Sequence, residues 1–258
     1  MRFIWMHKAD EESEAEVPPS AELIARMGRL MEEMAKSGVL LAGEGLQPSS
    51  TRVRLKFSGG ERTLTQGPLS GSNEVLGEFA IVRMKSMDEA IEYASRFGRA
   101  VGEAEIDIGQ VKEPWDLGLC PKPPEQTTRF MIMHKADRNF EAGPVADSSE
   151  INLIETLTEE KADALLSAER LQPSSKGTRL RFSEGKFRVI DGPFTESKEL
   201  IGGYCIVEVK SRDDAIAWAL RFAQVLGGSR VDGEVELDLL PLYERSSSAG
   251  LRKGFQFG

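Results

Sequence analysis

Charged and hydroxyl side chains are concentrated in one loop of the second half of the chain, residues 189–203. Asp191 is followed by Gly192 and Pro193, and then by Thr195, Glu196, Lys198 and Glu199. Pro193 fixes its own φ and restricts Gly192, and Asp191 can accept hydrogen bonds from turn amides, so we expect a rigid loop. Rigid loops are where binding groups concentrate, and we predict that this one surrounds a polar ligand. The alternative is a solvated connection in which Asp191 only holds the turn.

The two histidines, His7 and His134, occupy matching positions near the end of a predicted strand in each half. On such a strand His134 and Lys135 point to opposite faces. His134 could act as a general base near neutral pH, with Asp137 or Asp191 as its carboxylate partner. The alternative is a hydrogen-bonded structural histidine. No metal site is expected, because the two histidines lie in different halves of the chain.

Two arginines, Arg179 and Arg181, alternate along another predicted strand. Such a pair could hold a carboxylate or phosphate, and the alternative is a solvated strand face. Glu169, which precedes that strand, could face the same cleft or be a surface acid. The candidate catalytic residues are therefore Asp191 and His134, and the candidate ligand-binding residues are Lys135, Asp137, Glu169, Arg179, Arg181, Thr195, Glu196, Lys198 and Glu199.

The sequence segments that must position these residues occur twice in the chain. Met-His-Lys-Ala-Asp at residues 6–10 returns at 133–137, and Leu-Gln-Pro-Ser-Ser at 46–50 returns at 171–175. A period this long indicates two whole domains and not a solenoid of short repeats. We predict domains at residues 1–111 and 128–243, joined by a Pro-rich linker at 112–127 and followed by a mobile tail at 244–258.

Hydrophobic periodicity and turn residues predict the order strand, helix, hairpin, strand, helix, strand in each copy. In the first copy these are a strand at 3–7, a helix from Ser20 to Gly38, a hairpin over 52–66, a strand at 78–84, a helix opened by a capping box at 86–89 and a strand at 105–109. The second copy's first helix is placed at 149–168. This order matches a split βαβ unit with an added hairpin.

The run Asp191-Gly192-Pro193-Phe194, with the polar residues after it and the strand at 203–209, resembles the signature of the DGPF branch of the YCII-related proteins. The resemblance covers each copy separately. It implies two tandem ferredoxin-like α+β domains of the dimeric α/β-barrel type, with antiparallel sheets packed face to face and a cleft near the signature loop. It implies no particular reaction. We predict that the two copies form this pair within one chain, as a pseudo-symmetric dimer, and leave homodimerisation of the whole chain open.

The two copies differ at the signature. Gly67-Pro68 of the first copy matches Gly192-Pro193, but Asp191, Phe194, Glu196 and Lys198 are replaced by Gln66, Leu69, Gly71 and Asn73. The first copy has thus lost the acid and its flanking ions. We therefore predict one functional site, in the second copy.

Composition limits the partners. The net charge of −9 and sequence pI near 5.0 argue against nucleic-acid binding, which requires clustered Lys and Arg. Cys120 and Cys205 cannot form a disulfide framework, which favours a reducing cytoplasm. No stretch is long and apolar enough for a membrane span or signal peptide.

Three functions are compatible with these patterns. The first is a cofactor-free enzyme that acts on a small polar or aromatic metabolite, with Asp191 and His134 in proton transfer. The second is a binding or sensing module for such a molecule. The third is a protein-interaction module, because the resemblance carries an association with transcriptional regulation.

Overall fold

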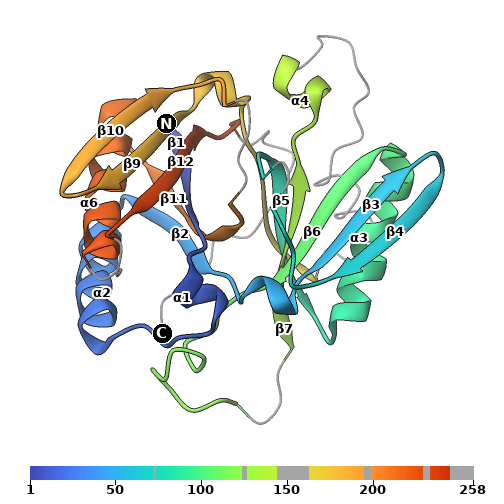
Figure 1. Ribbon diagram of the computed structural model, residues 1–258, viewed down its shortest axis with the longest axis horizontal. Helices are drawn as coiled ribbons and strands as arrows, with labels where there is room; N and C mark the ends of the chain where they lie inside the picture. Colours follow the sequence, from blue (N-terminus) through green and yellow to red (C-terminus); the bar gives the residue numbers. More distant parts are fainter. Residues whose placement is uncertain (72–73, 124–126, 144–162, 195–198, 229–232, 245–258) are drawn as a thin grey trace.

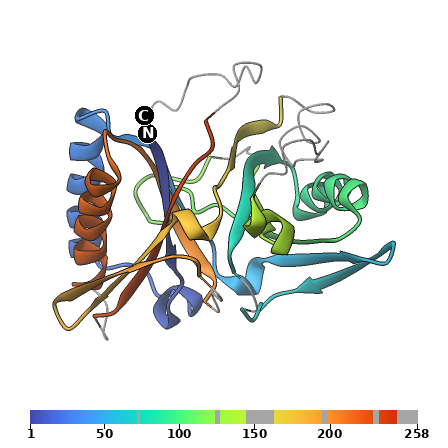
Figure 2. The same ribbon diagram turned by 90° about the horizontal axis from the view of Figure 1, so that it is seen from above.

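The chain folds around two six-stranded antiparallel sheets that lie between layers of helices (Figures 1 and 2). The computed structural model describes residues 1–71, 74–123, 127–143, 163–194, 199–228 and 233–244. The α+β class predicted from the sequence, with ferredoxin-like units and sheets packed face to face, is confirmed.

Each sheet has a hairpin at one edge and four further strands beside it. Sheet 1 contains, in spatial order, β10 (Lys186–Asp191), β9 (Thr178–Ser183), β12 (Val235–Pro241), β1 (Arg2–Lys8), β11 (Ile201–Glu208) and β2 (Leu40–Gly45). Sheet 2 contains β4 (Glu61–Gln66), β3 (Val53–Ser58), β6 (Ala104–Gln110), β7 (Thr128–Lys135), β5 (Leu76–Met84) and β8 (Leu165–Arg170).

In the part of the chain that the structure describes, three long helices cover the outer faces of the sheets. Helices α2 (Ala21–Lys36) and α6 (Arg212–Gly227) pack on sheet 1, and α3 (Met87–Val101) packs on sheet 2. Each begins at a serine whose hydroxyl accepts a hydrogen bond from the amide three residues on, namely Ser20, Ser86 and Ser211. Short helices α1 (Glu11–Glu14) and α4 (Arg138–Ala142) and the 3₁₀ turns η1 (Ser49–Thr51) and η2 (Ser174–Lys176) lie between strands.

The two sequence copies do not build one sheet each. Strand β1 of the first copy lies between β11 and β12 of the second, and β7 of the second lies between β5 and β6 of the first. The edge strands β2 and β8 are exchanged in the same way. Sheet 1 therefore combines β1, α2 and β2 of the first copy with β9 to β12 of the second, and sheet 2 combines β7 and β8 of the second copy with β3 to β6 of the first. The two repeats of the sequence therefore do not coincide with the two sheets of the structure.

The two sheets pack face to face through their inner faces. Residues of both sheets form one apolar cluster, in which the rings of Phe79 and Tyr204 lie 5.0 Å apart. Two ion pairs also cross between the sheets: Arg2 with Glu169, and Arg129 with Glu44 at 3.2 Å from Nη2 to Oε2. Burial of this apolar surface stabilises the pairing of the halves.

Two local predictions were wrong. Strand β2 was missed, because Leu40–Gly45 contains two glycines and does not alternate between polar and apolar residues. The helix predicted at 149–168 extends too far, because Leu165–Arg170 is strand β8. The part of this predicted helix at 149–162 lies outside the described residues. The predicted tail beyond Glu244 also lies outside them. Between β1 and α2 the chain forms the short helix α1, with Asp10 as its N-cap.

Candidate functional site

A buried ion cluster lies on the inner face of sheet 1. Lys8 Nζ donates to Asp238 Oδ2 at 2.7 Å, and Arg179 Nε donates to Asp238 Oδ1 at 2.6 Å. All three residues are buried. Burial alone would raise the pKa of Asp238, but Lys8 and Arg179 outweigh it and hold the pKa below its usual value. Asp238 therefore stays ionised and fixes the two cations in place.

Sheet 2 carries the counterpart of this cluster. Arg54 Nε donates to Asp107 Oδ1 at 2.7 Å, and Lys135 Nζ lies 3.0 Å from Asp107 Oδ2. A fourth residue, Glu74, is also buried and pairs with both Lys135 and Arg54. The matching residue in the second copy is Glu199, which is exposed. The cluster of sheet 2 therefore includes the buried carboxylate of Glu74, whereas the corresponding carboxylate of sheet 1, Glu199, lies at the surface.

A cleft of about 890 Å³ lies beside the cluster of sheet 1, between the end of β1, the β9–β10 hairpin and the start of β12. We call it the charged cleft; its lining is Lys8, Ala9, Asp10, Glu11, Glu14, Arg181, Phe182, Ser183, Glu184, Lys186, Arg188, Glu199, Glu234, Val235 and Glu236. Two of the predicted ligand-binding residues, Arg181 and Glu199, are among them. A third, Arg179, contacts the lining through Glu236, at 3.2 Å from Nε to Oε1.

Asp191 does not face the charged cleft. It pairs across the strands with Thr178, which lies on the same side of β9 as Leu180, toward the helices. On that outer face Asp191 accepts a hydrogen bond from Arg212, and Arg212 Nε donates to Thr178 Oγ1 at 3.0 Å. The side chain of Asp191 is 72% exposed. The signature acid therefore connects the hairpin to the start of α6.

The glycine of the signature turn is required by close packing. A Cβ on Gly192 would lie 1.8 Å from the carbonyl oxygen of Ser174, and Gly67 meets Ser49 in the same way. Both Gly-Pro bonds are cis. The amide of Phe194 donates to Ser174 Oγ at 3.1 Å, and the guanidinium of Arg179 lies 4.7 Å from the Phe194 ring. The turn is thus held against η2 and the ion cluster.

We expect Asp191→Asn to change the free energy of unfolding by less than about 1 kcal/mol, because the ion pair with Arg212 is largely exposed. Urea denaturation of the two proteins at neutral pH measures the difference. A loss above about 2 kcal/mol would show that this pair is far more important to the fold than its exposure indicates.

His134 lies in sheet 2, on the outer face, apart from Asp191. Its Nδ1 is 3.2 Å from Glu78 Oε1, and its ring packs edge-on against Phe97 at 4.8 Å. Its carboxylate neighbour is therefore Glu78 and neither Asp137 nor Asp191. In sheet 1 the matching His7 lies opposite Gly203, which has no side chain to offer.

The other predicted residues have separate positions. Asp137 caps α4 by accepting from the amide of Phe140 at 2.7 Å, and Glu169 is paired with Arg2 between the sheets. Lys135 belongs to the ion cluster of sheet 2. Thr195, Glu196 and Lys198 lie outside the described residues. The predicted set is thus divided between two sheets and does not form one constellation.

Sequence reasoning missed Lys8, Asp238 and Glu236. A signal for Lys8 was available, since it is the repeat counterpart of Lys135. Asp238 and Glu236 alternate with Leu237 and Val235 along β12, so their charges occupy the face opposite the helix-packed residues. A strand with apolar residues on one face and charged residues on the other can be recognised from the sequence. The pattern does not indicate whether Lys8 or Lys135 pairs with Asp238.

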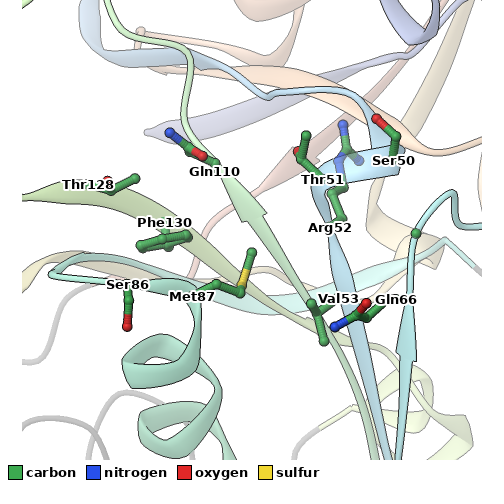
Figure 3. A pocket seen from close by; sticks show the side chains of 11 residues that line it. Ser50, Thr51, Arg52, Val53, Gln66, Ser86, Met87, Gln110, Thr128 and Phe130 are labelled. Carbon is green, nitrogen blue, oxygen red and sulfur yellow. The ribbon is translucent and has the colours of Figure 1, made fainter.

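A second, smaller cavity of about 370 Å³ lies in sheet 2, on the side of α3 (Figure 3). It is bordered by Gln66 and Gly67, the counterparts of Asp191 and Gly192, and by the start of α3. Its walls include the apolar side chains of Val53, Met87 and Phe130.

In the described part of the chain, no group of three or more His, Cys, Asp or Glu side chains is arranged to hold a metal ion. Nor does any described helix have the length and hydropathy needed to cross a membrane.

A family model described as the YCII-related domain matches residues 1–107 and again residues 128–232, so this chain belongs to the YCII-related family as a tandem repeat. An uncharacterised protein of Rhizobium meliloti (strain 1021), R00369, is 37% identical over 76 residues, which are 29% of this chain and 58% of that protein. The chain thus matches less than two thirds of this relative's length. No solved structure shows significant similarity to the chain.

Proposed function

We propose that this protein binds a small polar metabolite with a positively charged group in the charged cleft of sheet 1. The cleft, at about 890 Å³, is within the size range of metabolite sites. Binding is proposed in place of proton transfer by Asp191 and His134, because these residues lie in different sheets.

The charge of the lining supports a cationic ligand. Among the described residues, the cleft is lined by seven carboxylates, from Asp10, Glu11, Glu14, Glu184, Glu199, Glu234 and Glu236, and by four cations, from Lys8, Arg181, Lys186 and Arg188. Several of these charges are already committed within the protein: Lys8 to Asp238, Arg181 to Glu236, and Glu14 to Ser49. The lining groups without an ion pair or hydrogen bond among the described residues are the carboxylates of Glu11, Glu184 and Glu199 and the cations of Lys186 and Arg188, so a ligand must interact with these.

The observation that carries the proposal is the position of Glu199. Its counterpart Glu74 is buried and ion-paired, whereas Glu199 is exposed at the cleft and has no ion pair within 4 Å among the described residues. Glu11, on the other side of the cleft, likewise has none. Glu199 is attracted to Arg179 but, like Glu11, forms no ion pair within 4 Å among the described residues, so both carboxylates can accept hydrogen bonds from an ammonium or guanidinium group.

A charge-matched set of compounds tests the proposal. Thermal-shift and calorimetric titrations should show stabilisation by 1,4-diaminobutane, and little or none by succinate or 1,4-butanediol, which have the same four-carbon length. Glu199→Gln should weaken diamine binding about tenfold, since a charged hydrogen bond contributes about 1.5 to 3 kcal/mol. Asp191→Asn, also on the signature loop, is the matched control and should leave the affinity unchanged.

Preferential binding of succinate, or equal diamine binding by wild type and Glu199→Gln, would contradict the proposal. So would a diamine affinity that depends on Asp191 and not on Glu199.

A further inference from the structure

The smaller cavity of sheet 2 exists because one interaction of the second copy is missing from the first. In the second copy Arg212, at the start of α6, bonds to Thr178 and Asp191 and so occupies the space between helix and hairpin. The corresponding three residues at the cavity are Met87, Val53 and Gln66. None of these is charged, and the space between α3 and the β3–β4 hairpin is left as a cavity of about 370 Å³.

From this arrangement we infer that the cavity is a second binding site, for a small neutral molecule with an apolar ring and a hydroxyl or amide group. The inference goes beyond the proposed function, because the cavity lies in the other sheet, on its helix side, and shares no lining residue with the charged cleft.

The rim of the cavity is polar and uncommitted. The side chains of Ser50, Gln66, Gln110 and Thr128 line it and make no hydrogen bond within the described part of the chain. Gln110 and Thr128 are found only in sheet 2, because the corresponding residues of sheet 1 are Pro241 and Met1. Amide and hydroxyl groups can both donate and accept, which suits a neutral polar group on the ligand.

The lining offers little to a charged ligand. Arg52 is its only charged residue among those described. That guanidinium is already bonded to the carbonyl oxygens of Gln47 and Ile201, at 2.8 to 3.0 Å, and points away from Val53 and Gln66 (Figure 3). A charged ligand would lose its hydration here without gaining a partner.

The apolar walls select the body of the ligand. Val53, Met87 and Phe130 present aliphatic, thioether and aromatic surfaces to the same space (Figure 3). A flat ring can pack against Phe130 and the Met87 sulfur while its polar group reaches the rim. Benzamide has this form, and benzoate and benzylammonium differ from it mainly in charge.

The test is a ligand-observed NMR titration of the whole chain with these three probes. Benzamide should bind saturably, and benzoate and benzylammonium at least tenfold more weakly. Gln66→Asp with Met87→Arg introduces two of the three interacting residues of the second copy into the cavity, and should lower benzamide affinity at least tenfold. Thr128→Met, which introduces the residue of the other half, should do the same by filling the rim, and serves if the double variant does not fold.

Absence of saturable benzamide binding to the wild type, equal binding of benzoate, or benzamide affinity unchanged in the folded variants would overturn the inference. Glu199→Gln should not alter benzamide binding. The benzamide titration therefore tests the cavity of sheet 2 independently of the proposed function of the charged cleft.

Discussion

Replacement of Asp238 by asparagine is expected to lower the free energy of unfolding by about 3 to 5 kcal/mol, because it leaves Lys8 and Arg179 buried without their shared anion. The same chemical change at Asp191, whose side chain is 72% exposed, should cost less than about 1 kcal/mol. Urea denaturation of both variants and the wild type at pH 7 measures the contrast. Similar losses for the two variants would contradict the buried cluster of sheet 1.

The Asp238 contribution should also depend on pH in one direction. Because its pKa in the folded protein is below the ordinary value of 3.8, the unfolded chain binds more protons in that range. Its stabilisation is therefore complete well above pH 4 and is lost as the pH falls through the folded pKa. The difference between wild type and Asp238→Asn should shrink between pH 5 and pH 2, and a constant difference would contradict an ionised, depressed carboxyl.

Gly192→Ala is expected to destabilise the protein by about 3 kcal/mol, because the added methyl group would lie 1.8 Å from the carbonyl oxygen of Ser174. Ser174 is fully buried and bonded to Glu141, so η2 has little room to move. The midpoint of urea unfolding reports the loss.

Gly28→Ala is the matched control for this substitution. Gly28 lies within α2, and a Cβ there meets nothing within 4 Å. Alanine should raise stability by about 0.5 to 1 kcal/mol, since it restricts the unfolded chain and favours the helix. A Gly192→Ala loss below about 1 kcal/mol would mean that the turn relaxes easily around the methyl group.

The sequence predicted the local elements well where one periodicity and one cap agreed. The hydroxyl of Ser20 begins α2 and that of Ser86 begins α3, as expected. The alternation of β7 correctly placed His134 and Lys135 on opposite faces, since His134 packs on Phe97 and Lys135 meets Asp107 between the sheets. These features depend on residues near one another in the chain.

The exchange of strands between the copies could not be predicted from the sequence. Because the two copies repeat the same pattern, β1 is equally suited to β5 and to β11, and only the three-dimensional arrangement distinguishes them. The same limit applies to the ion clusters: Lys8 and Lys135 stand in identical local sequences, yet Lys8 meets Asp238 and Lys135 meets Asp107.

The residues predicted for the site lie in different parts of the structure. The region of the signature was informative, since Arg181 and Glu199 line the charged cleft. The role of Asp191 could not be read, because a one-residue step along β10 decides whether a side chain faces the cleft or the helices. In the first copy, Gln66 and Met87 stand in the places of Asp191 and Arg212. The two copies therefore differ in both partners of this contact, and not only in the acid.

The exchange of strands between the copies requires that Asp238 of the second copy pairs with Lys8 of the first. Two double-mutant cycles test this directly, one combining Asp238→Asn with Lys8→Met and the other combining it with Lys135→Met. We predict a coupling energy of about 1 to 3 kcal/mol with Lys8, and a coupling with Lys135 within about 0.5 kcal/mol of zero. Strong coupling to Lys135 and none to Lys8 would mean that each copy forms its own sheet, and would contradict the exchanged fold.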